Sequence, residues 1–180
     1  FRLRRPTPLT VVRAFFFLWF AGGSFLQPFL PIFYRGQGLT GFEIGILSSI
    51  GFAIGMLAAP VWSRWMDRVR APQRLLQLAL LLYIVFMLLL SRQSAFWPIA
   101  GVVALSALVS SALEPVSNVL AVRATRGTGS GFGSVRVFGS LGWAVLVVVA
   151  GWWIQQTSIQ ASFQGFALCM TAAGLALFLF

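Results

Sequence analysis

The chain has 180 residues, of which 59% are hydrophobic and 9% are charged, and its formal net charge is +10. Soluble domains carry about 25% charged residues, so the composition excludes an ordinary soluble domain and indicates an integral membrane protein. The positive charge comes entirely from arginines that lie between apolar runs, which favours membrane topology over nucleic-acid binding.

The first long apolar segment, 14–34, follows the basic stretch FRLRRPTPLTVVR. It is too long for a signal peptide and lacks a small-residue cleavage site, so it predicts a membrane-spanning helix. Pro28 and Pro31 lie inside it, as membrane helices tolerate. Its one amide, Gln27, could make an interhelical hydrogen bond or line a cavity.

The second span is expected over 43–61. Gly51, Gly55 and Ala59 recur in it at intervals of four, which predicts a face that packs closely against another helix. The loop that follows, WSRWMDRVRAPQR, is rich in arginine, and Asp67 within it has a simple interpretation as a solvated loop charge.

Four more spans are expected at 75–90, 96–122, 132–154 and 163–180. The fourth contains Glu114 and Pro115, and the proline should kink the helix and free a carbonyl near the carboxylate. The fold class is therefore all-α, with six transmembrane helices in one bundle over residues 1–180.

Arg136 lies a few residues inside the fifth span. An arginine in hydrocarbon costs about 3 kcal/mol on insertion scales and needs a partner or water. The expected partner is Glu114, with Asn118 one turn later. Ser140 and Trp143 follow Arg136 at i+4 and i+7, so the three side chains should share one helix face. The alternatives are a structural Glu114, an Arg136 that reaches the headgroups, and a Trp143 that serves only packing.

Arginine counting predicts the orientation. Ten arginines flank the spans on one side, namely Arg2, Arg4, Arg5, Arg13, Arg64, Arg68, Arg70, Arg74, Arg123 and Arg126, and only Arg35 and Arg92 lie on the other. Both termini should therefore be cytoplasmic. Four tryptophans near the expected interfaces should form an aromatic belt: Trp19, Trp97, Trp152 and Trp153.

Several kinds of chemistry are disfavoured. The chain has no histidine and a single cysteine, Cys169, so we expect no metal site and no disulfide. Its acidic residues are Glu43, Asp67 and Glu114, and no two of them share the interior of a span. We therefore expect no cofactor and no enzymatic activity.

Three motifs, in order, resemble the amino-terminal half of a major facilitator superfamily transporter: FLQPFLPIFY in span one, SRWMDRVR after span two, and FGSVRVFGSLGW opening span five. The likeness is greatest to the branch of the lactose permease and the phenylpropionate permeases. It implies one six-helix half of a two-half fold. Because the chain lacks an initiator Met and ends in an apolar run, we expect a fragment or a half, with the carboxy-terminal half absent.

The resemblance also implies roles for residues. In the sugar permease, the arginine of the span-five motif pairs with an acidic residue of span four, and a tryptophan two turns later stacks on the sugar ring. The matching positions here are Arg136 and Trp143, whereas the acidic position falls on Asn118. Either Glu114 takes over the ion pair, or recognition uses neutral hydrogen bonds. Asp67 and Arg68 resemble part of the family's conformational gating loop, although the glycine of that motif is Ser63 here.

We therefore predict a secondary transporter of the bacterial inner membrane that moves a small polar solute by alternating access, in a lipid bilayer and with no nucleic-acid partner. A sugar, a nucleoside and an aromatic acid remain open as solutes. Proton symport, with Glu114 as the coupling acid, is implied by the resemblance. The pore would need the missing half or a second copy. The alternative is a non-transporting six-span scaffold or assembly protein with a structural Glu–Arg pair.

Overall fold

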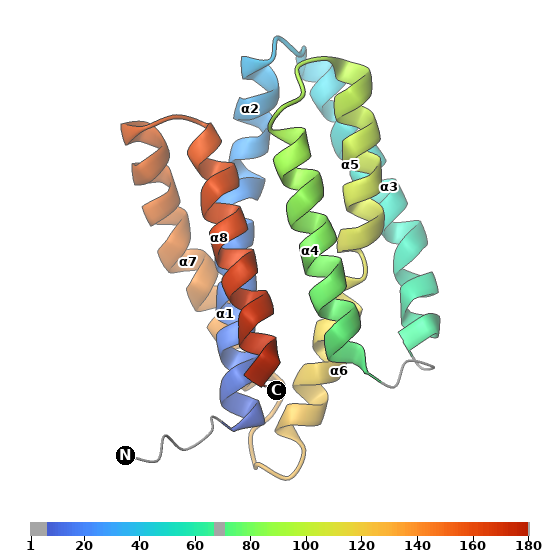
Figure 1. Ribbon diagram of the computed structural model, residues 1–180, viewed down its shortest axis with the longest axis vertical. Helices are drawn as coiled ribbons and strands as arrows, with labels where there is room; N and C mark the ends of the chain where they lie inside the picture. Colours follow the sequence, from blue (N-terminus) through green and yellow to red (C-terminus); the bar gives the residue numbers. More distant parts are fainter. Residues whose placement is uncertain (1–6, 67–70, 180) are drawn as a thin grey trace.

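The computed structural model describes residues 7–66 and 71–179, and within these residues all regular structure is helical (Figure 1). Six helical segments are long and apolar enough to cross a membrane: Pro8–Gly36, Gly41–Trp65, Pro72–Leu90, Phe96–Thr125, Gly133–Gln156 and Gln160–Leu179. The predicted all-α fold with six membrane spans is confirmed.

The first span consists of three helical pieces: α1 (Pro8–Leu26), the 3-10 turn η1 (Gln27–Phe29) and α2 (Leu30–Gly36). The break follows from Pro28 and Pro31, which have no N–H to donate to the preceding turn. The span therefore crosses the bundle with an interruption at Gln27, and backbone regularity is lost at a polar side chain.

The second and third spans are α3 (Gly41–Met66) and α4 (Pro72–Leu90). A capping box starts α3: the backbone N–H and the hydroxyl of Thr40 both donate to Oε2 of Glu43 at 2.8 Å, and the Glu43 N–H donates to the Thr40 hydroxyl oxygen at 3.3 Å. One of the three acids is thus engaged in capping a helix. Asp67 lies outside the described residues.

The fourth span is divided into α5 (Phe96–Ser110) and α6 (Leu113–Thr125), and α7 (Gly133–Gln156), α8 (Gln160–Ala176) and the turn η2 (Leu177–Leu179) complete the chain. The link between α6 and α7 turns at Gly127 and Gly129, whose φ angles of +73° and +69° favour glycine over residues with a side chain.

α1 lies at the centre of the packing and makes its most extensive contacts with α7 and α8. The α1–α7 contact is very close at Gly142, where a Cβ atom would overlap the carbonyl oxygen of Phe17. On the other side, a Cβ at Gly165 of α8 would overlap the ring of Phe25. Glycine at these two positions allows α1 to sit between its neighbours.

Burial is uneven across the bundle. In the most apolar part of the first span 56% of residues are buried, against 11% in α3 and 17% in α7. α3 consequently presents large apolar side chains such as Phe52 and Met56 on its surface, and α7 presents Val148. Lipid or further protein must cover such surfaces.

The start of α1 and the end of η2 lie at the same end of the bundle, as an even number of spans requires (Figure 1). The described arginines of the predicted cytoplasmic group also belong to this end: Arg13, Arg64, Arg74, Arg123 and Arg126. Arg35 closes α2 and Arg92 follows α4 at the opposite end.

Candidate functional site

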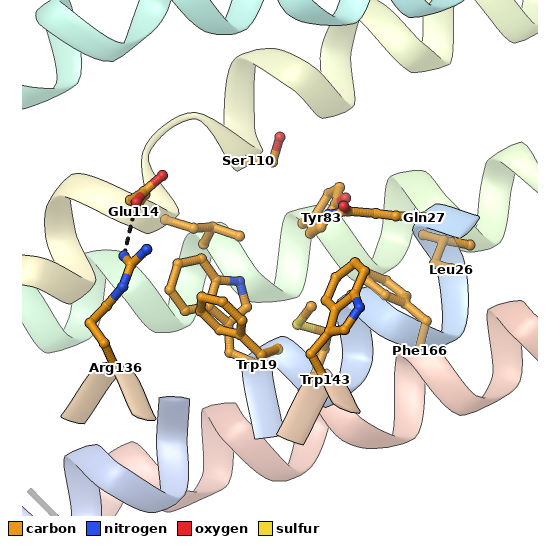
Figure 2. A pocket seen from close by; sticks show the side chains of 13 residues that line it. Trp19, Leu26, Gln27, Tyr83, Ser110, Glu114, Arg136, Trp143 and Phe166 are labelled. Carbon is orange, nitrogen blue, oxygen red and sulfur yellow. Dashed lines mark hydrogen bonds and ion pairs between the residues drawn. The ribbon is translucent and has the colours of Figure 1, made fainter. Parts of the chain in front are cut away.

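A cavity of about 390 Å³ opens within the bundle, and five of the six spans contribute to its wall (Figure 2). We call it the ion-pair cavity because two of its lining residues are Glu114 and Arg136. Its other polar and aromatic lining residues are Trp19, Phe20, Gln27, Tyr83, Ser110, Trp143 and Phe166. A concave site with an apolar wall and few polar groups is typical of small-ligand binding.

Arg136 Nη1 donates to Glu114 Oε1 at 3.1 Å and forms the ion pair predicted between these side chains. Arg136 also lies over the ring of Phe20, with its guanidinium carbon 5.7 Å from the ring centroid. The two ionic side chains remain 41% and 62% exposed. The pair is therefore accessible from the cavity, and Arg136 does not extend away to the headgroups.

The backbone break between α5 and α6 positions Glu114. Pro115 has no N–H, and the chain leaves the α-helical pattern just before it, where the Ala112 N–H donates to the Val109 carbonyl at 3.1 Å. The predicted kink is thus present as a full interruption of the helix. Glu114 occupies the first turn of α6, at a positive end of the peptide dipoles, where a carboxylate is stabilised.

The interruption frees the carbonyl of Leu108, whose usual partner would be the N–H of Ala112. Trp62 of α3 compensates: its Nε1–H donates to the Leu108 carbonyl at 2.9 Å. The Ser111 hydroxyl donates to the same oxygen at 2.7 Å. A side chain from a different span therefore holds the break in place.

Two other predicted site residues share the cavity with the pair, and two do not. Gln27 lines it from η1, and Trp143 lines it from α7, where its ring lies against Gly23 of α1. Ser140 is exposed and is not one of the described residues that line this cavity. The spacing of four places it on the same side of α7 as Arg136, but its short side chain does not reach the cavity.

Asn118 lines a neighbouring groove of about 420 Å³, together with Glu114 and Pro115. Its Oδ1 atom is buried and has no hydrogen-bond partner among the described residues. Of the two alternatives for the acidic position, the structure pairs Arg136 with Glu114. Glu114 thus lines two hollows, the ion-pair cavity and this groove.

The opposite wall of that groove is formed by α3, through Gly51, Gly55, Ala59 and Ser63. A Cβ at Gly55 would meet no described atom within 4 Å, and at Gly51 the nearest is Val103 Cγ1 at 3.8 Å. Within the described chain, therefore, no helix approaches this stripe closely enough to require glycine. The small side chains border open space instead.

Of the predicted gating loop, the structure describes only Ser63, whose hydroxyl donates to the Ala59 carbonyl at 3.0 Å. Asp67 and Arg68 lie outside the described residues. The role of the loop stays a prediction.

The cavity wall also contains residues that the sequence patterns do not assign to a site. Trp19 was expected in an interfacial belt, but it lines the cavity and stacks on Phe15 at 5.8 Å between ring centroids. A signal was present, because Trp19, Gly23 and Gln27 follow one another at intervals of four and so lie along one stripe of the span. Tyr83 of α4 gave no such signal, since it lies among leucines.

Comparisons with known proteins agree with this architecture. The model of the MFS_1 like family matches residues 9–180. The maltose permease of Geobacillus stearothermophilus is 32% identical over 169 residues, which are 93% of this chain and 43% of the permease. The uncharacterized transporter YwbF of Bacillus subtilis (strain 168) is 26% identical over 141 residues, 78% of this chain and 35% of that protein.

The multidrug resistance protein MdtG of Salmonella paratyphi A is 32% identical over 123 residues, 66% of this chain and 30% of that protein. The chain thus spans less than half the length of these relatives, which are transporters and not enzymes. The greater likeness to the lactose permease branch stays a prediction. The chain belongs to the MFS_1 like family and forms a six-helix half of the major facilitator superfamily fold.

Proposed function

We propose that this chain is the solute-binding amino-terminal half of a secondary transporter, with the ion-pair cavity as its binding site. One observation carries the proposal: a charged pair is exposed to a cavity within membrane-spanning helices, at 41% and 62% of its side-chain surface. Ionisable groups inside a membrane are expensive, and they mark substrate or ion pathways.

The chemistry of the cavity supports a small polar solute with a ring. Only one nitrogen of Arg136 contacts Glu114, so its other guanidinium nitrogens can bind a hydroxyl or carboxylate of the solute. Trp143, Trp19 and Phe20 offer flat faces for a sugar, base or phenyl ring. The likeness to a maltose permease supports the sugar among these classes.

Transport would follow the alternating-access scheme, in which two half-bundles rock about a shared site. The second half-bundle would be supplied by the rest of the transporter or by a second copy, and it would cover the exposed apolar faces of α3 and α7. Glu114 would carry the coupling proton, releasing it when Arg136 returns to the carboxylate. The arginine distribution supports cytoplasmic termini for this half, within the inner membrane of a bacterium.

Uptake into proteoliposomes of the full-length transporter tests the proposal. The solutes would be maltose, adenosine and phenylpropionate, each measured with and without an imposed proton gradient. We expect accumulation of at least one solute, accelerated by an inward proton gradient. A folded protein that accumulates none of the three would refute the proposal, and accumulation that ignores the gradient would refute proton symport.

A further inference from the structure

A third hollow of about 410 Å³ adjoins the ion-pair cavity, and η1, α2, α3, α4 and α5 border it. We call it the hydroxyl chamber because Tyr34, Ser48 and Ser106 are among the residues that line it. Gln27, Tyr83 and Ser110 line both hollows. These three side chains come from three different spans and lie near one another at the edge of the ion-pair cavity in Figure 2, so the two hollows meet at them.

The polar groups of the chamber are neutral. The hydroxyl of Ser48 donates to the Ile44 carbonyl at 3.0 Å, and that of Ser106 donates to the Val103 carbonyl at 2.9 Å. Each serine hydroxyl thus donates its hydrogen bond within its own helix, and the lone pairs of its oxygen can still accept a hydrogen bond from a donor in the chamber.

The tyrosines complement the serines. No hydrogen bond engages the hydroxyl of Tyr34 or Tyr83 within the described part of the chain, so both can donate to a bound group. Among its described lining residues the chamber holds no charged side chain, in contrast to the ion-pair cavity. Acceptors and donors are therefore available without a fixed charge.

We propose that the hydroxyl chamber is a second solute subsite, which takes an uncharged, hydroxyl-bearing part of the solute while a ring of the same solute lies in the ion-pair cavity. This inference rests on the proposed function and extends it. A hydroxyl-rich group can exchange hydrogen bonds with the serines and tyrosines, whereas a carboxylate would be desolvated there without a cation. Each hollow has the volume of a small-ligand site, which is about 300–1,000 Å³.

A subsite in the hydroxyl chamber would distinguish between the three possible solute classes, which are a sugar, a nucleoside and an aromatic acid. A two-ring sugar and a nucleoside each join a ring to an uncharged group that carries several hydroxyls. An aromatic acid joins its ring to a charged group, which the ion-pair cavity alone could bind. The subsite therefore favours the first two classes over the third.

Ser48 and Ser49 provide a matched pair of variants. Both are exposed residues of α3 whose hydroxyls donate to a carbonyl four residues earlier, but only Ser48 lines the chamber. Ser48→Leu should fill part of the chamber and Ser49→Leu should not. Ser48→Val should fill a smaller part of the chamber than Ser48→Leu. The amount of monodisperse protein in each preparation shows whether the variants fold.

The assay uses the full-length transporter and whichever labelled solute the wild type accumulates, maltose or adenosine. Unlabelled solute competes in one series, and its truncated counterpart, methyl α-glucoside for maltose or adenine for adenosine, competes in another. We expect the inhibition constant of the truncated counterpart, divided by that of the complete solute, to fall at least tenfold in S48L, less in S48V, and not in S49L.

Equal ratios of inhibition constants in S48L and S49L would overturn the proposed subsite and leave the proposed transport function intact. Accumulation of phenylpropionate alone would also overturn it, because that solute has no uncharged hydroxyl-bearing part. Accumulation of none of the solutes by the wild type would refute the proposed function, and the subsite with it.

Discussion

Glu114→Gln distinguishes an ion pair that serves transport from a structural one, because the two roles predict effects of different size on the free energy of unfolding and on uptake. In the structure the pair has one contact, Arg136 Nη1 to Glu114 Oε1 at 3.1 Å, and both side chains remain substantially exposed, at 41% and 62%. Exposed ion pairs contribute about 0.2–1 kcal/mol to stability, whereas removing one partner of a buried pair costs about 3–5 kcal/mol. Glutamine keeps the size of glutamate and can still accept a hydrogen bond from Arg136. We therefore expect the free energy of unfolding to fall by less than about 1 kcal/mol.

Uptake should respond quite differently. The amide that replaces the Glu114 carboxylate cannot bind and release a proton, so we expect proton-coupled accumulation to fall more than tenfold, which corresponds to about 1.4 kcal/mol or more in the transport step. Two assays on the same preparations measure both quantities: initial rates of uptake in proteoliposomes, and the denaturation midpoint of the purified protein. A double-mutant cycle with Arg136→Gln gives the coupling energy of the pair directly.

Glu43→Gln is the matched control. It is the same substitution in the same protein, at a residue that caps α3 and faces neither hollow. Glutamine at position 43 can still accept the hydrogen bonds of Thr40, because a capping box takes either glutamate or glutamine, so E43Q should change stability little and leave uptake intact. If the free energy of unfolding of E114Q fell by about 3 kcal/mol or more while transport was retained, the ion pair would be structural. That result would refute the reasoning and favour the non-transporting scaffold protein.

Two further predictions concern the packing that holds the cavity. Gly142→Ala should destabilise the protein by about 1–3 kcal/mol, because the added Cβ overpacks the α1–α7 contact. Gly151→Ala in the same helix is the control, since its Cβ would come no closer than 4.0 Å to a neighbour. Equal denaturation midpoints for the two variants would contradict the close approach at Gly142. Trp62→Phe removes the N–H that donates to the Leu108 carbonyl and should cost about 1 kcal/mol, with slower uptake because the break before Glu114 loses its support. Trp65→Phe keeps that hydrogen bond and is the control, so equal losses of uptake in the two variants would show that the hydrogen bond does not matter.

The sequence predicts the number of spans and the ion pair well, for related physical reasons. Apolar runs of membrane length allow few alternatives, and an arginine inside one of them requires a nearby acid. Glu114 was the only acid inside a neighbouring span, so its pairing with Arg136 followed from the scarcity of charges. Pro115 likewise predicts a break in the fourth span, because a missing N–H acts locally.

The wall of the cavity was harder to predict. Gly51, Gly55 and Ala59 indicated helix packing, but they border an open groove. Spacing along one helix shows which residues share a face and not what that face meets, which depends on the placement of the other helices. Tyr83 and Ser110 illustrate the same limit, since their importance comes from a junction of three spans that no local pattern records.

The ion pair also has a consequence for biosynthesis. Its two residues are 22 positions apart and lie in consecutive spans, joined by the link that turns at Gly127 and Gly129. Spans leave the ribosome in order, so the carboxylate of α6 has already reached the membrane machinery when the arginine of α7 arrives. The cost of about 3 kcal/mol for an arginine in hydrocarbon is then met by a counter-charge on the adjacent helix. The same two side chains can therefore guide the nascent helical hairpin into the bilayer long before any solute reaches them.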